Sequence, residues 1–170
     1  MDETVVSNAL KAISQFAIGE GEHGIVFRLP KVEDVCGKYH KLGYTPNEYE
    51  MLVKAYKVGC SVPEPKGEFL SKSVFLMDII YGSTIDQLLK QEKRFSEEIV
   101  DECIAITAEF NQRFTHRDLY PRNMMLEGWK EKDGVIIEGS PFIIDLYLAR
   151  MGPSKEWHRV RPWFHGRIAK

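Results

Sequence analysis

The segment 114–126, FTHRDLYPRNMML, carries histidine, arginine, aspartate and asparagine side chains between two apolar runs. Asp118 precedes Asn123 by five residues. An aspartate can orient an attacking hydroxyl and accept its proton, and an asparagine can bind a divalent cation through its amide oxygen. Asp145 ends the apolar run PFIID and supplies a second carboxylate, which would be costly there if it stayed unpaired. Each residue alone is an ordinary turn former or helix cap, but together they predict acid–base chemistry with a divalent metal.

Three glycines near the N-terminus, Gly19, Gly21 and Gly24, have the spacing G-x-G-x-x-G. Glycine permits positive φ angles and lets backbone N–H groups come close to a phosphate. The residues that follow, IVFRL, are typical of a strand, so the turn joins two strands rather than a strand and a helix. This context favours a loop folded over the phosphates of a nucleotide.

Lys38, in VCGK, lies on the strand expected after the glycine-rich hairpin. If its side chain faces inward it needs an anionic partner, because an unpaired buried ammonium is costly. Glu48 can serve, since it shares a face of the following helix with Leu52. Glu50 and Lys41 are the competing acid and base, and Lys41 would point to the opposite face of a regular strand from Lys38.

Periodicity and capping signals place the elements that hold these residues. We expect a helix over 3–15, a strand, glycine turn and strand over 15–29, a third strand over 33–42, a helix over 45–59, and a hairpin over 67–80 with its turn at 71–73. Thr45, Pro46 and Gly59 fit the N-cap, the first turn and the end of the second helix.

The second half of the chain is expected to contain more helix than the first half, which is rich in strands. We expect helices over 84–91 and 96–114, the latter capped by Ser96, then a strand over 123–127, a polar excursion over 128–140 and a strand over 141–145. A boundary between two lobes is expected near residues 79–83.

Composition narrows the class of protein. The chain has 170 residues, 44% of them hydrophobic, and a formal net charge of -2, which fits one domain or two small lobes and argues against an electrostatic nucleic-acid binder. Three scattered cysteines argue against a disulfide framework and a structural zinc site. The acidic N-terminus does not have the pattern expected of a signal peptide, and no stretch approaches the roughly 20 apolar residues of a membrane span. We expect a reduced, cytoplasmic protein. The basic segment from Arg150 onward, whose one acid is Glu156, is expected to be a solvated end, and an acidic or nucleic-acid partner stays open.

In order along the chain, the glycine turn, VCGK, Glu48, HRDLYPRN and a DLY in place of D-F-G resemble the protein-kinase signature set. The match runs from about Ile18 to Asp145. It implies an α+β, bilobal kinase-like fold with a β-rich N-lobe over 1–80 and a truncated helical C-lobe over 81–170. The HRD-x-x-x-x-N element is its most specific part.

The resemblance implies a role for each matching residue. Lys38 would contact the α- and β-phosphates of ATP and pair with Glu48. Asp118 would be the catalytic base or orient the acceptor, and Asn123 and Asp145 would hold Mg²⁺, with Mn²⁺ as an alternative. The stretch FLMDIIYGSTI is similar to a kinase hinge, in which Asp78 and Ile80 would offer backbone groups to adenine, and the three glycines would cover the phosphates.

The departures from the pattern concern the acceptor. Tyr120 stands where Ser/Thr kinases carry lysine, Tyr147 replaces the glycine of D-F-G, and 25 residues follow Asp145, with no A-P-E and no room for a peptide-binding platform. In its length and in the residue patterns of the HRDLY and IDLY motifs, the chain resembles small atypical kinases, namely the RIO-type and lipopolysaccharide-core kinases. The segment KVGCSVPEP is loosely similar to the corresponding RIO-type segment.

The sequence therefore predicts an ATP- and Mg²⁺-dependent kinase. A protein Ser or Thr hydroxyl, including the chain's own, is the first expected acceptor, and a small-molecule or sugar hydroxyl is the alternative. A nucleotide-binding pseudokinase scaffold is the second alternative. It would bind a partner or nucleic acid through the basic tail and its aromatic residues, Trp157, Trp163 and Phe164; the competing interpretation is that these aromatics pack against the C-lobe.

Overall fold

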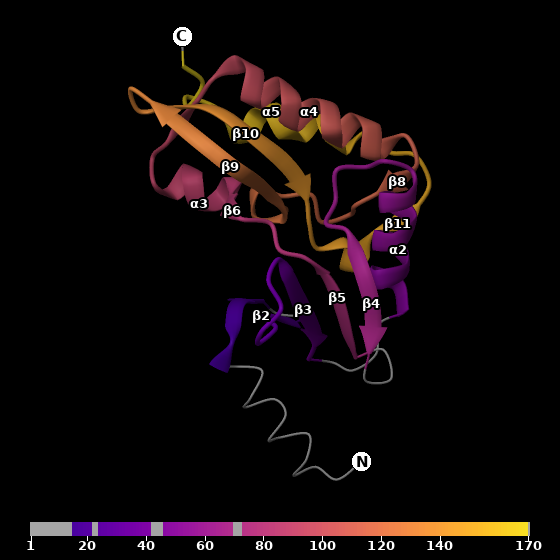
Figure 1. Cartoon of the computed structure of the whole chain (residues 1–170). Helices are drawn as coiled ribbons and strands as arrows, with labels where there is room; N and C mark the ends of the chain where they lie inside the picture. The colour runs from indigo at the N-terminus through magenta and orange to yellow at the C-terminus, as the bar shows by residue number, and fades with distance from the viewer. Residues whose placement is uncertain (1–14, 22–23, 42–45, 70–72, 170) are drawn as a thin grey trace.

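The structure, a computed structural model, describes residues 15–21, 24–41, 46–69 and 73–169 (Figure 1). Nearly all of the helix expected over 3–15, the Thr45 cap and most of the turn expected at 71–73 lie outside these residues.

A five-stranded antiparallel sheet in the order β1-β2-β3-β5-β4 forms the N-terminal lobe. Its strands are β1 Ala17–Glu20, β2 Gly24–Arg28, β3 Val35–His40, β4 Pro65–Phe69 and β5 Val74–Asp78. The predicted strand–turn–strand, third strand and hairpin are therefore confirmed. In this register Lys38 at the centre of the sheet lies between Val26 and Phe75.

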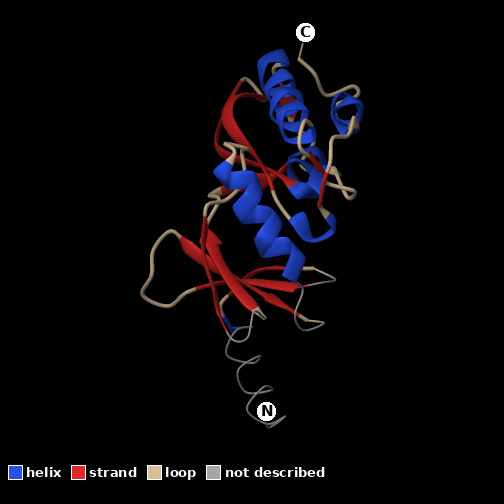
Figure 2. Cartoon of the chain, turned by 90° about the vertical axis from the view of Figure 1, so that its right-hand side faces the viewer, coloured by secondary structure: helices blue, strands red, loops and turns tan. Residues whose placement is uncertain are grey.

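Helix α2, Pro46–Lys57, joins the two lobes (Figure 2). Its apolar face, which includes Met51, Leu52 and Ala55, belongs to the main hydrophobic core. Near its start the side chain of Asn47 donates to the carbonyl of Ala149 in the C-terminal lobe, at 2.8 Å. The helix ends just before Gly59, as the sequence predicts.

The C-terminal lobe combines helices with a second sheet, whose order is β6-β9-β10-β7. The strands are β6 Gly82–Thr84, β7 Arg94–Phe95, β9 Met124–Lys132 and β10 Val135–Ile143, and the helices are α3 Ile85–Lys90, α4 Glu97–Asn111 and α5 Val160–Trp163. Thr84 closes a capping box on α3 and Ser96 caps α4, so both predicted helix starts are confirmed.

The polar excursion expected over 128–140 is instead the outer half of a long hairpin. Both β9 and β10 have nine residues, and the turn between them is Asp133-Gly134, with φ of 51° and 78°. Two successive positive φ angles are typical of the tight turn that an Asp-Gly pair favours. The polar residues are therefore exposed strand positions, and the hairpin carries its buried end into the cleft.

The C-terminal segment packs against this lobe. Phe164 is fully buried and contacts Phe95 edge to face, at 4.8 Å between ring centroids, and Trp163 packs against the same core. Of the three tail aromatics only Trp157 is exposed. This favours the packing interpretation over a base-stacking surface. The remaining short elements are β8 Phe114–Thr115, β11 Arg150–Met151, η1 Pro121–Asn123, η2 Leu146–Leu148 and η3 Glu156–Arg159.

The predicted α+β class and two-lobed arrangement are thus confirmed, with a C-terminal lobe that carries a sheet as well as its helices.

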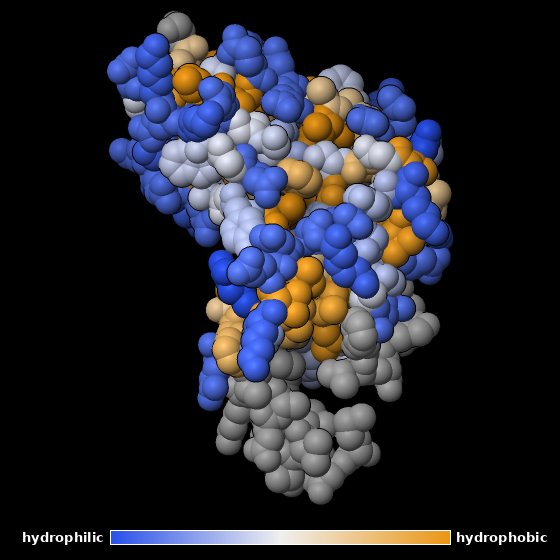
Figure 3. Space-filling model, in the orientation of Figure 1, coloured by the Kyte–Doolittle hydropathy of each residue, from blue (hydrophilic) through white to orange (hydrophobic). Residues whose placement is uncertain are grey.

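Hydrophobic residues gather on the visible face of the N-terminal lobe over β3 and β5 (Figure 3). Within the described ranges, none of the helices is long and apolar enough to cross a membrane.

Candidate active site

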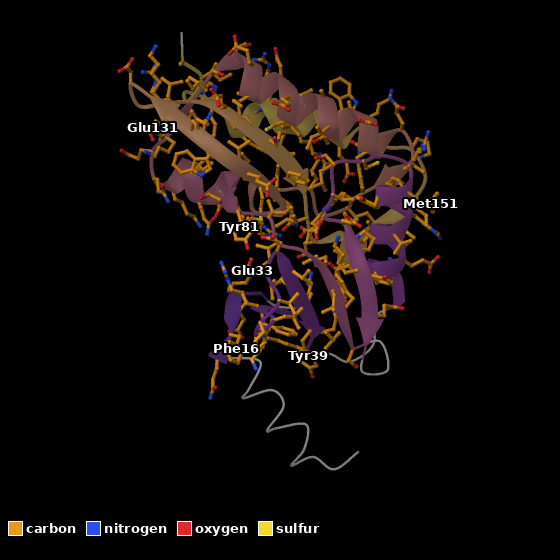
Figure 4. The ribbon with its side chains drawn as sticks, in the orientation of Figure 1. Phe16, Glu33, Tyr39, Tyr81, Glu131 and Met151 are labelled. Atoms are coloured by element: carbon orange, nitrogen blue, oxygen red, sulfur yellow. The ribbon has the colours of Figure 1, made fainter. Side chains whose placement is uncertain are left out.

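A cleft of about 680 Å³ opens between the two lobes. Its walls come from the glycine turn and β3, from the connecting segment 79–81, and from the ends of β9 and β10. Figure 4 shows Tyr81 of the connecting segment at the junction of the lobes. The cleft brings together every site residue that the sequence predicts, namely Gly19, Gly21, Gly24, Lys38, Glu48, Asp78, Ile80, Asp118, Asn123 and Asp145.

Lys38 faces inward from β3 and makes two ion pairs. Its Nζ atom lies 2.7 Å from Glu48 Oε1 and 2.8 Å from Asp145 Oδ1. The competing residues lie on the surface, where Lys41 pairs with Glu20 and Glu50 pairs with Lys54. The inward pair is therefore Lys38 with Glu48.

Burial and charge act against each other in this cluster. Burial alone lowers the pKa of Lys38, but the carboxylates of Glu48 and Asp145 outweigh it and hold that pKa above its usual value. For Glu48 burial is the largest effect and raises the pKa, the Lys38 ammonium lowers it, and the negative charge of Asp145 raises it; together these effects bring the pKa of Glu48 to about 7. His40 lies beside the pair, with Nε2 3.4 Å from Glu48 Oε2. Glu48 is therefore a carboxylate whose charge is sensitive to what binds at Asp145.

The glycine turn is closed by a hydrogen bond from the Gly21 N–H to the Gly24 carbonyl, at 2.9 Å. A Cβ atom at Gly24 would lie 2.7 Å from the Tyr39 carbonyl oxygen, so this glycine is required by the close approach of β2 and β3. Among the described residues, nothing lies within 4 Å of a Cβ atom built at Gly21. The described part of the turn at Gly21 therefore leaves room for a ligand.

Within the described residues, the connecting segment has one backbone N–H without an acceptor, that of Ile80. The Asp78 N–H donates to Glu64 and the Ile79 N–H donates to Asp34, while the Asp78 carboxylate pairs with Lys66. Among the described residues none accepts a hydrogen bond from the Ile80 N–H. Of the two residues predicted for this segment, Ile80 is therefore the freer to contact a ligand.

The β9–β10 hairpin places Asn123 beside Asp145. The ladder ends at Met124 and Ile143, and one further bond, from the Ile144 N–H to the Asn123 carbonyl at 3.0 Å, extends it to the cleft. Asp145 then leaves the strand in the left-handed region, with φ 57°. A non-glycine residue in that region is a local strain that is common at functional sites.

Asp118 lines the cleft and accepts four side-chain hydrogen bonds, one at its backbone carbonyl and three at its carboxylate. The Asn123 Nδ2 group donates to the Asp118 carbonyl at 2.7 Å and to its Oδ2 at 2.9 Å. The Arg122 Nη2 group donates to both carboxylate oxygens, at 2.9 and 3.0 Å. Because the Asn123 nitrogen is held by Asp118, its amide oxygen is the atom that can bind a cation.

His116 braces the loop from behind. Its Nε2 lies 2.9 Å from the Ile144 carbonyl, and its Nδ1 lies 3.3 Å from the Asp118 N–H. Burial lowers the pKa of His116, with a partly opposing effect from its hydrogen bond to the Ile144 carbonyl. A neutral ring that donates through Nε2 and accepts at Nδ1 satisfies both contacts. His116 thus connects the residue before Asp145 to Asp118.

Glu156 is a second brace that sequence reasoning missed. Its buried carboxylate accepts the backbone N–H groups of His116 and Arg117, at 2.7 and 2.9 Å, and further bonds from Asn111 and Ser154. Arg117 has φ 68°, which these bonds hold in place, while its side chain is exposed. The available signal was that Glu156 is the one acid in a basic tail.

The donor set suits a hard divalent cation that is shared with a ligand. Asn123 supplies an amide oxygen and Asp145 a carboxylate, and both line the same cleft. No cluster of three or more histidine, cysteine or acidic side chains that could hold a metal occurs among the described residues. Mg²⁺ is commonly held by one or two protein oxygens together with substrate phosphates, so these two residues fit it.

Two solved structures with similar folds are Rio2 kinases from Chaetomium thermophilum. One is 15% identical, has a TM-score of 0.63, and is matched over 96% of this chain and 61% of that chain. The other, a complex with ADP/Mg²⁺ and phosphoaspartate, is 14% identical, has a TM-score of 0.60, and is matched over 95% of this chain and 57% of that chain. The present chain thus spans about three fifths of the length of these kinases, and at such identities the likeness shows the fold.

No curated protein matches the chain. The family model of the RIO domain matches residues 37–143, from the neighbour of Lys38 on β3 to the end of β10. This match covers more than half of the chain and includes Lys38, Glu48, Asp118 and Asn123. The chain therefore belongs to the RIO domain family, the atypical kinase-like group that its sequence motifs predict.

Proposed function

We propose that this protein is an ATP- and Mg²⁺-dependent kinase that transfers the γ-phosphoryl group to a hydroxyl acceptor. The observation that carries the proposal is the convergence of Lys38, Asp118 and Asp145 in one interlobe cleft, with Lys38 2.8 Å from Asp145. Phosphoryl transfer is catalysed mainly by positioning and charge stabilisation, so few residues suffice. The chain would act as one minimal kinase domain with an N-lobe over 1–80 and a C-lobe over 81–170.

Each residue has a definite task in the proposed reaction. Lys38, held by Glu48, donates to the α- and β-phosphates under the glycine turn, and the Ile80 backbone contacts the base. Asp118 orients the acceptor hydroxyl and takes its proton. The hydroxyl oxygen bonds to the γ-phosphorus while the bond to the β,γ-bridging oxygen breaks, and its electron pair leaves with ADP. Asn123 and Asp145 would hold Mg²⁺, or Mn²⁺ as the alternative, whose charge offsets that of the phosphates.

A protein Ser or Thr hydroxyl, including the chain's own, is the first proposed acceptor, and a sugar or other small-molecule hydroxyl is the second. The relative solved with phosphoaspartate adds an aspartyl phosphate as a third product. These products differ chemically, since an acyl phosphate is cleaved by hydroxylamine and a Ser or Thr phosphate ester is not. A cytoplasmic location stays a prediction from the sequence.

The test is transfer from γ-labelled ATP in the presence of Mg²⁺, with and without a panel of protein and sugar acceptors. Asp118→Ala is expected to reduce labelling about 10²-fold or more, and Asp145→Ala to abolish it. Asp101→Ala is the matched control, because Asp101 is exposed on α4 and does not line the cleft. Labelling that persists in Asp145→Ala would contradict the metal assignment. Nucleotide binding without transfer to any acceptor or to water would support the pseudokinase scaffold instead.

A further inference from the structure

The acceptor side of the cleft carries one cation that the proposed reaction leaves without a task. Among the described residues, three basic side chains line the cleft, those of Arg28, Lys38 and Arg122. Lys38 is neutralised by two carboxylates, and the Arg28 guanidinium lies 5.8 Å from the Tyr81 ring centroid at the connecting segment. Of the described lining residues, Arg122 is therefore the one cation beside Asp118.

The Arg122 guanidinium is preorganised but not saturated. It lies 4.7 Å from the centroid of the Tyr120 ring, in cation–π contact, and its Nη2 group bonds to Asp118. A guanidinium has five N–H donors in a planar fork, and no other acceptor for them occurs among the described residues. The side chain is 58% exposed, so the unused edge of the fork faces solvent at the mouth of the cleft.

We propose that Arg122, supported by the Tyr120 ring, selects an acceptor hydroxyl that has an anionic group a few ångströms away. The inference rests on the proposed kinase function, because a hydroxyl must reach Asp118 to react. Any such hydroxyl lies next to the Arg122 fork, which binds carboxylates and phosphates bidentately. The Arg122–Asp118 pair is exposed, and exposed ion pairs are weak, so an anion on the acceptor can draw the guanidinium away from Asp118 and uncover the base.

The proposed acceptor class is a Ser or Thr in an acidic peptide context, with a sugar phosphate as the second source of the same chemistry. In the transfer step the acceptor hydroxyl loses its proton to Asp118 and gains the phosphoryl group, with ADP as the leaving group. The acceptor anion takes no part in bond making and serves only to bind Arg122.

The experiment compares acceptors that differ only in charge. Peptides with one Ser flanked by Asp or Glu are compared with the same peptides carrying Asn or Gln, and a sugar phosphate is compared with its parent sugar. The wild type is expected to prefer the anionic member by about tenfold in kcat/KM, or ~1.4 kcal/mol. Arg122→Gln is expected to lose this preference, and Arg122→Lys to keep part of it, because lysine retains the charge without the fork.

Arg159→Gln is the matched control, since Arg159 is exposed on η3 and does not line the cleft; it is expected to keep the full preference. Asp145-dependent ATP hydrolysis, with water as the acceptor, is measured in parallel. If anionic and neutral acceptors react equally, the acceptor inference is wrong and the proposed function stands. If hydrolysis proceeds but neither kind of acceptor reacts, the acceptor inference is wrong and only the nucleotide-cleaving part of the proposed function stands. If Arg122→Gln slows anionic and neutral acceptors by the same factor, Arg122 acts on the transferred phosphate and the inference is also wrong. Absence of ATP turnover would overturn the proposed function itself.

Discussion

Replacing Glu156 by alanine removes the acceptor for two backbone donors of the 116–123 loop, the N–H groups of His116 and Arg117 at 2.7 and 2.9 Å. Glu156 is 8% exposed, so the vacated space is poorly supplied with water. A buried donor without a partner costs about 1–3 kcal/mol, which gives ~2–6 kcal/mol for the pair. Because the shorter side chain admits some water, we expect a loss of about 3 kcal/mol in the free energy of unfolding.

Urea denaturation followed by tryptophan fluorescence measures this loss. With a slope of about 2 kcal/mol per molar urea, the midpoint should fall by about 1.5 M in Glu156→Ala. Glu156→Gln keeps an acceptor oxygen and should lose roughly half as much. Glu138→Ala is the matched control: Glu138 is 56% exposed and pairs with Lys130 on the surface, where such pairs contribute at most ~1 kcal/mol. A midpoint for Glu156→Ala indistinguishable from that of Glu138→Ala would refute the reasoning.

Three further outcomes are expected. Burial raises the folded-state pKa of Glu48 from 4.5 to about 7. The stabilisation that comes from protonated Glu48 is therefore full below pH ~4.5 and is lost as the pH rises to 7. In contrast, kcat/KM for ATP should rise through pH ~7, because the ionised Glu48 carboxylate holds Lys38. A flat profile in the wild type, or a rise that persists in Glu48→Gln, would contradict this. Gly24→Ala should lower the melting temperature by several degrees, at a cost of about 1–3 kcal/mol, because the new Cβ would meet the Tyr39 carbonyl at 2.7 Å. Gly21→Ala should change the melting temperature little, because no described atom lies within 4 Å of its Cβ position. Equal shifts in the two variants would contradict the steric argument. Mg²⁺ alone should move the melting temperature by less than ~1 °C, since the chain offers only two oxygen ligands for it among the described residues. Saturating Mg²⁺–ADP should raise the melting temperature by about 5 °C. Calorimetry of Asp145→Ala, which is expected to lack that rise, tests the assignment of Asp145 as a metal ligand.

The sequence predicts the local parts of this fold well because their signals are local. Ser96 and Thr84 begin helices, and the glycine turn joins strands, since capping and turn chemistry depend on adjacent residues. The sequence predicts strands that are too short for the hairpin over 124–143, because the exposed residues of these strands are polar. The Asp-Gly pair is the local signal that indicates the turn. The kinase-like order of the motifs identified the ten cleft residues, since each motif position carries its own chemistry.

The braces of the site were harder to predict because they depend on contacts between distant segments. Glu156 lies 40 residues from His116 in sequence, and no local pattern in a basic tail shows that one acid will be buried under a loop. Arg122 was visible within the motif, but its contact with the Tyr120 ring depends on the 3₁₀ turn at Pro121–Asn123. Residue type predicts chemistry here, and only the tertiary structure shows which groups are already paired.

The distribution of these pairings separates the fixed parts of the site from its exchangeable part. His116, Asn123 and Glu156 hold the 116–123 loop through bonds that are at least partly buried, so the position of Asp118 is set before any ligand arrives. Arg122 differs because its contact with Asp118 is exposed and leaves most of the guanidinium donors unused. In such a site the position of the Asp118 base is fixed, and only the cationic group paired with its carboxylate can be exchanged. Acceptor choice should therefore respond to substitutions at Arg122, whereas substitutions at Glu156 should alter stability and rate for every acceptor alike.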